Sequence, residues 1–153
     1  MSGTRLLPWL VAVVVGLEVL LVSMPPGLAI LDARFHYSAT EALAFLEELG
    51  ARGRADYAIH ESIDLVFLAS YTHLFRMIAA RWSLAVPPKL LFVPGAADLV
   101  ETAGVLALLA MDHPRSRLLA SVIGFATSAK WLGLLVVAVA FAIAFGKRRK
   151  PAT

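Results

Sequence analysis

The stretch from residue 89 to residue 111 is long and apolar enough to cross a bilayer, yet it carries Asp98 and Glu101 near its middle. A transmembrane helix needs about 20 apolar residues. Residues three apart lie on one face of a helix, and a carboxylate facing hydrocarbon costs about 2.5 to 3.5 kcal/mol. The acidic face is therefore predicted to point into protein, so the chain must supply other helices around it.

Three further apolar blocks supply those helices. The hydrophobic fraction of 59% exceeds the roughly 45 to 50% that is typical of soluble domains. We predict an all-α membrane protein, a four-transmembrane-helix bundle that forms a single domain over residues 1–153. Its predicted elements are membrane helices at 6–24, 57–80, 89–111 and 118–145, an outer amphipathic helix at 38–49 and a basic tail at 146–153.

The charges at the two ends of the predicted helices differ. One end carries only bases: Arg5, Arg76, Arg81, Lys89, Lys147, Arg148, Arg149 and Lys150. The other end mixes bases with acids, so the positive-inside rule places both termini in the cytoplasm. The final basic run is then a topology anchor, and nothing favours nucleic-acid binding. Abundant Ala and the absence of Asn and Gln are typical of a GC-rich genome, from which we expect a bacterial inner membrane.

The loop between the first two membrane helices contains a capping motif. It is predicted to follow the outer surface as far as Phe35 and then to begin a helix at Ser38. The Ser38 hydroxyl can accept the amide of Glu41 while the Glu41 carboxylate reaches back, and Gly50 is placed to end the helix. This short amphipathic helix is either an interfacial helix that shields the loop or a lid over a cavity.

Polar side chains recur at membrane depth in all four predicted spans. Glu18 in the first span argues for a retained helix rather than a signal peptide. In the second, two acids lie three apart and a tyrosine continues their face; in the fourth, a lysine lies about as deep as Glu101, at 1.5 Å per residue. The candidate ligand-binding or polar-cluster residues are Glu18, Glu61, Asp64, Tyr71, Asp98, Glu101 and Lys130.

These acids outnumber the one deep amine. Pairing Lys130 with Asp98 or Glu101 is the simplest arrangement, because breaking a buried pair strands a charge at a cost of about 3 to 5 kcal/mol. We expect at least one remaining acid to be protonated at neutral pH, or a cation or bound amine to supply the missing charge.

Two features of the last two helices bear on their packing. Pro94 removes a backbone hydrogen bond one turn before Asp98, which produces either a packing kink or an ion or substrate site. In the fourth helix, Ser121, Gly124 and Ser128 are small residues that permit close helix contact.

A series of short motifs runs from about residue 30 to residue 135: Leu31-Asp32, Tyr37-Ser38-Ala39-Thr40-Glu41-Ala42, Leu49-Gly50, Gly53-Arg54, Tyr57, Asp64, Tyr71, Ala97-Asp98-Leu99-Val100-Glu101, Thr127 and Lys130-Trp131-Leu132. The series resembles a group of uncharacterised bacterial four-helix membrane proteins with no assigned activity. The resemblance implies the architecture and the polar positions, but no function. Thr102 stands where that group is expected to carry Asn. The topology is also similar to the sterol-isomerase class, as an analogy without a shared motif.

Three functions are compatible with these residues. The first is a structural or partner-binding membrane subunit, alone in the lipid bilayer, as a homo-oligomer or with another membrane protein. The second is an intramembrane cavity that binds a lipid, isoprenoid or cationic small molecule, with an isomerase-like enzyme as its catalytic form. The third is a proton or cation pathway. No catalytic residue is assigned, enzymatic activity is the less favoured outcome, and we expect neither a metal nor a cofactor, since His60 and Asp64 are only a weak metal pattern.

Overall fold

The computed structural model describes residues 3–24, 30–111 and 116–149. Its elements are α1 (Gly3–Ser23), the 3-10 helix η2 (Leu31–Ala33), α2 (Ala39–Glu48), α3 (Gly50–Arg81), α4 (Pro88–Leu109) and α5 (Arg117–Arg149). Helices α1, α3, α4 and α5 are each long and apolar enough to cross a membrane. The prediction of an all-helical protein with four helices that could span a membrane is confirmed.

Two helix boundaries differ from the predicted ones by four residues or more. Helix α3 begins at Gly50 rather than at Tyr57. Gly50 has a φ of 62°, a left-handed conformation that glycine adopts without strain, so α2 ends and α3 starts within one residue. Helix α5 continues to Arg149, so part of the predicted basic tail is helical. Residues 150–153 of that tail lie outside the described residues.

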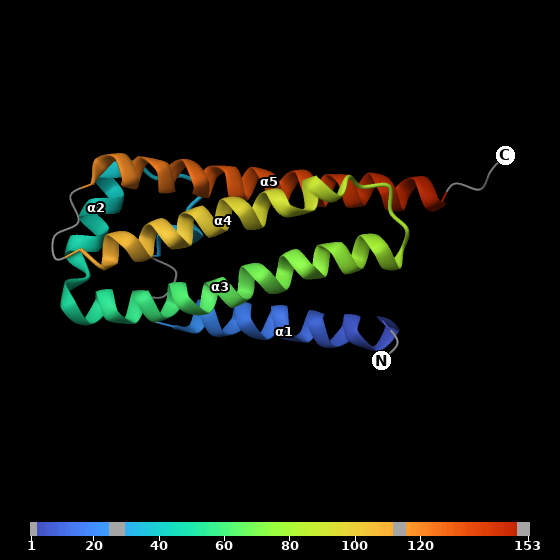
Figure 1. The fold of residues 1–153 in the computed structure, drawn as a ribbon, viewed down its shortest axis with the longest axis horizontal. Helices are drawn as coiled ribbons and strands as arrows, with labels where there is room; N and C mark the ends of the chain where they lie inside the picture. Colours follow the sequence, from blue (N-terminus) through green and yellow to red (C-terminus); the bar gives the residue numbers. More distant parts are fainter. Residues whose placement is uncertain (1–2, 25–29, 112–115, 150–153) are drawn as a thin grey trace.

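The helices are arranged with α4 in a central position (Figure 1). Helix α4 packs against both α3 and α5, whereas α1 packs mainly along α3. The start of α1 and the end of α5 lie at the same end of the bundle, and α2 lies across the opposite end (Figure 1). We call these the far end and the α2 end.

The three central helices lie in close contact at Pro94 and Gly95 of α4. A Cβ on Gly95 would lie 2.2 Å from Oγ1 of Thr72 in α3, and one on Gly133 of α5 would lie 3.3 Å from Pro94. Pro94 is buried inside α4. The absence of side-chain bulk at the two glycines therefore allows α3 and α5 to clamp α4 at this level.

The segment from Ile30 to Ser38 follows α5 into the bundle and not the surface path that was predicted. Nε1 of Trp131 donates a hydrogen bond to the carbonyl of Arg34 at 2.9 Å. Trp131 lies about 21 Å along α5 from its start, at 1.5 Å per residue. A Cβ on Gly124 would lie 2.4 Å from the Tyr37 carbonyl, so this glycine makes room for the loop segment and not for another helix.

Two apolar clusters fill the bundle at different levels. The cluster at the α2 end, called the cap cluster, comprises Ile30, Leu31, Tyr37, Ala42, Leu46, Tyr57, Val105, Leu108, Ala120 and Ile123. The other, called the far cluster, consists of Leu84, Val86, Leu91 and Val137 with partly buried neighbours that include Phe75, Ile78, Phe141 and Phe145. Along α3, α4 and α5 the residues between the two clusters include the candidate polar positions.

Candidate functional site

Polar side chains from α3, α4, α5 and the loop after α1 meet between the two apolar clusters, and two of them, Tyr37 and Tyr57, also belong to the cap cluster. Their polar atoms are largely buried, and in Asp32, whose residue is partly exposed, both carboxyl oxygens are buried. We call this group the polar core. It comprises Asp32, Tyr37, Tyr57, His60, Glu61, Asp64, Tyr71, Asp98, Glu101, Thr102, Thr127 and Lys130.

Lys130 ties α5 to α4 through two ion pairs. Its Nζ lies 3.0 Å from Oδ1 of Asp98 and 2.6 Å from Oε2 of Glu101. The side chain of Lys130 is 8% exposed, and those of the two acids are 4% and 0% exposed. The predicted pairing is therefore present, and it involves both acids. Since a one-turn slide of either helix would separate these groups, the pairs fix the register of α4 and α5.

Neutral hydroxyl groups donate hydrogen bonds to one carboxyl oxygen each of Asp98, Asp64 and Glu101. Tyr71 donates to Oδ2 of Asp98 at 2.9 Å, and Thr102 donates to Oδ2 of Asp64 at 3.0 Å. Both bonds join α3 to α4. In α5, Thr127 donates to Oε1 of Glu101 at 2.5 Å. The central part of the polar core is thus a connected hydrogen-bond network across three helices.

Tyr37 brings the loop segment into the same network. Its hydroxyl lies 3.0 Å from Oγ1 of Thr127 and donates to Oε1 of Glu101 at 3.4 Å. Burial, together with the neighbouring Glu101 charge, raises the pKa of the Tyr37 hydroxyl well above its ordinary value. Tyr37 therefore remains a neutral hydrogen-bond donor at any physiological pH.

A different situation holds for Asp32 and Glu61, which we call the acid pair. Within the part of the chain that the structure describes, no hydrogen bond of ordinary geometry reaches any of their four buried carboxyl oxygens, and the neighbouring Tyr57 hydroxyl interacts with Glu61. The two carboxyls interact with each other. Burial raises the pKa of Asp32 although the charge of Lys130 opposes this. We infer that the acid pair holds a proton.

Charge balance leads to the same conclusion. The polar core contains five carboxyl groups, from Asp32, Glu61, Asp64, Asp98 and Glu101, and one lysine. Unpaired buried charges are far more costly than neutral hydrogen-bonded groups. Full ionisation of all five acids is therefore excluded, and protons must neutralise most of the excess.

The structure brings together all but one of the candidate residues. Glu61, Asp64, Tyr71, Asp98, Glu101 and Lys130 lie in the polar core. Glu18 does not, because it is exposed on α1, the helix that packs mainly along α3.

Sequence reasoning missed the other members of the core, which are Asp32, Tyr37, Tyr57, His60, Thr102 and Thr127. Helical spacing gave a usable signal for three of them, since Thr127 lies three residues before Lys130, His60 four before Asp64 and Thr102 four after Asp98.

The α2 helix closes the end of the bundle above the polar core. Its N-cap Ser38 and Glu41 form the predicted capping box. Ala42 and Leu46 are fully buried in the cap cluster. The predicted amphipathic helix is therefore packed by its apolar face onto the bundle, and the polar core lies beneath a layer of close apolar contacts.

Comparisons of the chain with known protein families, curated proteins and solved structures find no match. Function must therefore be inferred from the geometry of the polar core and of the exposed helix surfaces. In the described ranges, no three His, Asp or Glu side chains are placed to hold a metal ion. Protons, ion pairs and hydrogen bonds are the chemistry that the polar core offers.

Proposed function

We propose that this chain is a structural, partner-binding subunit of a bacterial inner membrane, with both termini cytoplasmic. The orientation is supported by the bases at the far end, among them Arg81, Lys89, Lys147 and Arg148. The structural role is supported by the closed polar core, in which Lys130 and its partners hold three helices in one register. The partner-binding role rests on α1.

Helix α1 is the least covered of the membrane helices. Only 6% of its apolar window Leu6–Ser23 is buried, against 44% of the window in α4. Glu18 lies in this window and is exposed. Because a carboxylate facing lipid costs about 2.5 to 3.5 kcal/mol, another protein is expected to cover Glu18. This exposed intramembrane acid is the observation that carries the proposal.

The neighbours of Glu18 define the surface that the partner would contact. Val11, Val15 and Val22 lie at helical spacing on the same face and are 41%, 56% and 47% exposed. Leu21, three residues after Glu18, is buried at 6% exposure, so this edge of the face is already covered within the chain. The partner is a membrane helix, from another protein or from a second copy, that offers a hydrogen-bond donor or a base at the depth of Glu18.

Replacing Glu18 with Leu tests this proposal. The protein is released gently from its own membrane, and its assembly mass is measured by native mass spectrometry. Wild type should leave the membrane with a second polypeptide, and Glu18→Leu should leave as a monomer with unchanged thermal stability. Val13→Leu is the matched control, because Val13 is 46% exposed on a different face of α1. A monomeric wild type, or a Glu18→Leu assembly of unchanged mass, would contradict the proposal.

A second function, proton binding, is favoured by the acid pair. The unpaired oxygens of Asp32 and Glu61 need a donor, and the cap cluster and the far cluster enclose the polar core on both sides. A proton is the cation that fits such a closed site. The packed far cluster supports proton binding over passage through the membrane.

Infrared spectroscopy can test proton binding directly. A protonated carboxyl gives a carbonyl band that an ionised one lacks, so wild type should show this band at neutral pH. Asp32→Asn or Glu61→Gln should reduce the band, because each removes one carboxyl of the acid pair, whereas Glu48→Gln, at an exposed position of α2, should not change it. A wild-type spectrum without the band at neutral pH would exclude the function.

A further inference from the structure

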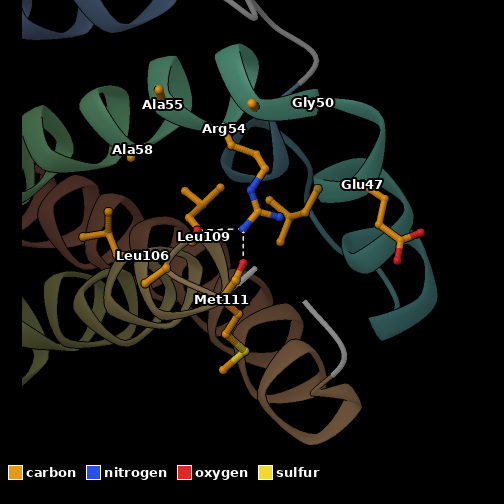
Figure 2. A pocket seen from close by; sticks show the side chains of 11 residues that line it. Glu47, Gly50, Arg54, Ala55, Ala58, Leu106, Leu109 and Met111 are labelled. Carbon is orange, nitrogen blue, oxygen red and sulfur yellow. Dashed lines mark hydrogen bonds between the residues drawn. The ribbon is translucent and has the colours of Figure 1, made fainter. Parts of the chain in front are cut away.

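A groove opens on the side of the bundle at the α2 end, between the end of α2, the start of α3 and the end of α4 (Figure 2). Its cavity volume is about 690 Å³, within the range of roughly 300 to 1,000 Å³ that small-molecule sites occupy. Its lining residues belong neither to the polar core nor to the exposed face of α1. The groove therefore needs an explanation of its own.

Small side chains create the apolar part of the groove. Ala51, Ala55 and Ala58 of α3 line one wall, and Leu106 and Leu109 of α4 line the other. Because the alanines have no side chain beyond Cβ, the two helices leave a furrow between them at this level. Both helices are candidate membrane spans, so the furrow is suited to a hydrocarbon chain from the leaflet at the α2 end.

A guanidinium group lies at the polar end of the groove. Nη2 of Arg54 donates to the carbonyl of Leu109 at 2.7 Å and to the carbonyl of Met111, as Figure 2 shows. These bonds cap the end of α4 and hold the arginine in place. The bonds leave from Nη2, so the N–H groups of Nη1 and Nε can bind a second acceptor. A fixed guanidinium with free donors matches the geometry of a phosphate group.

A carboxylate lies on the α2 side of the same groove. Glu47 lines the groove and is exposed, and Figure 2 shows it across the groove from Arg54. Among the residues that the structure describes, no hydrogen bond or ion pair engages the Glu47 carboxylate. Because the carbonyl end of α4 is close by, this side of the groove favours a positively charged group.

We propose that the groove binds a phospholipid whose headgroup carries both a phosphate and a primary ammonium, that is, a phosphoethanolamine lipid. Arg54 binds the phosphate, Glu47 accepts hydrogen bonds from the ammonium, and an acyl chain lies along Ala58 and Leu106. A quaternary choline cannot donate to Glu47. An anionic lipid has no positive group to pair with Glu47 and the carbonyl end of α4, so it should bind more weakly.

Lipid retention measured by native mass spectrometry tests the proposal. The delipidated protein is offered equal amounts of phosphatidylethanolamine, phosphatidylcholine and phosphatidylglycerol with the same acyl chains. Wild type should retain the ethanolamine lipid about fivefold over each of the others, the preference expected of one exposed charge pair. Glu47→Gln should remove the preference over choline, and Ala58→Leu, which fills the furrow, should abolish retention of all three. Both variants keep the Arg54 cap on α4.

Ala103→Leu is the matched control, because it adds the same side chain at an exposed position of α4 outside the groove, and it should retain lipid as wild type does. Equal retention of the three lipids by wild type, a preference for phosphatidylglycerol, or an unchanged preference in Glu47→Gln would overturn the proposal. Free phosphoethanolamine should not displace the lipid at equal concentration. If it does, the acyl chain contributes nothing and the lipid is not the ligand.

Discussion

The polar core and the far cluster occupy the same three helices, yet they hold these helices together by opposite means. The polar core uses ion pairs and hydrogen bonds, with Lys130 at its centre. The far cluster packs Leu91 and Val137 against the loop residues Leu84 and Val86. In lipid, apolar contacts between helices gain little hydrophobic free energy, because the alternative neighbour is also apolar. The polar core is therefore expected to set the register, while the far cluster contributes packing.

The comparison is tested most severely by Lys130→Met. Removing the amine leaves Asp98 and Glu101 buried without their cation, which should lower the free energy of unfolding by about 3 to 5 kcal/mol. The loss is measured by reversible unfolding in mixed micelles. Lys147→Met, the same replacement at an exposed position of α5, should change stability by no more than about 0.5 kcal/mol.

Neutralising the acids as well should recover much of the loss. The triple variant with Asp98→Asn and Glu101→Gln carries no stranded charge, so it should be more stable than Lys130→Met alone. Independent, additive losses in the three positions would show that the ion pairs do not act as a unit. In that case the ion pairs of the polar core would not fix the register of α4 and α5, as the contacts indicate they do.

The corresponding change in the far cluster is Leu91→Ala. Leu91 is 3% exposed, and its truncation should cost about 2 kcal/mol, the low end for a buried Leu→Ala change, because lipid reduces the transfer contribution. Leu99→Ala is the control on the same helix, since Leu99 is 48% exposed, and it should cost less than about 0.5 kcal/mol. If Leu91→Ala were as costly as Lys130→Met, the two halves of the bundle would not differ as proposed.

The ion pairs of Lys130 were predictable because they depend only on depth. In a regular helix the position in the sequence gives the depth, at about 1.5 Å per residue, so counting residues is enough to place Lys130 and Glu101 at one level. The helix face of Asp98 and Glu101 followed from their spacing alone. Depth and face together were enough for the centre of the polar core.

The same reasoning did not place Glu18 or Asp32. Glu18 has the right depth, but depth does not say which helices are neighbours, and α1 packs mainly along α3. Asp32 lies in a segment whose path depends on tertiary contacts such as the bond from Trp131 to the Arg34 carbonyl. Gly124 gave a real signal of close approach, but the partner is the Tyr37 backbone. A small residue in a helix indicates that another part of the chain packs closely there, but it does not identify that part.

The acid pair makes the polar core sensitive to pH, and the far cluster has no such sensitivity. Burial raises the pKa of Asp32 above its ordinary value of 3.8, so the native protein holds a proton that the unfolded chain releases. Stability should therefore fall as pH rises from 3.8 through the raised pKa, by at most about 1.4 kcal/mol per pH unit for one group. Asp32→Asn should flatten this slope in unfolding measured across pH.

Leu91→Ala serves as the reference for that experiment, because it should lower stability by a similar amount at every pH. A slope in Asp32→Asn equal to that of wild type would show that Asp32 is not the titrating group. The proton would then belong to Glu61 or Asp64, and the carbonyl band of the protonated carboxyl would persist in the Asp32 variant.

The smallest expected effect concerns the capping box of α2, which carries a carboxyl with the opposite response. Glu41 accepts hydrogen bonds from the Ser38 amide and from the Ser38 hydroxyl, each at 2.7 Å, and both bonds lower its pKa below the ordinary value of 4.5. Its contribution is present above pH 4.5 and is lost as pH falls through the lowered pKa. Ser38→Ala should cost about 1 kcal/mol, with Thr40→Ala, exposed in the same turn, as a near-neutral control in the same unfolding assay.

The capping box thus separates two causes of acid sensitivity at the α2 end. Acidification stabilises the polar core through Asp32 and weakens the α2 cap through Glu41, so Ser38→Ala should leave the Asp32 slope above pH 4.5 unchanged while it reduces the loss at lower pH. If Ser38→Ala altered the slope above that value, the α2 cap would itself influence the pKa of Asp32, and the two causes would not be separable.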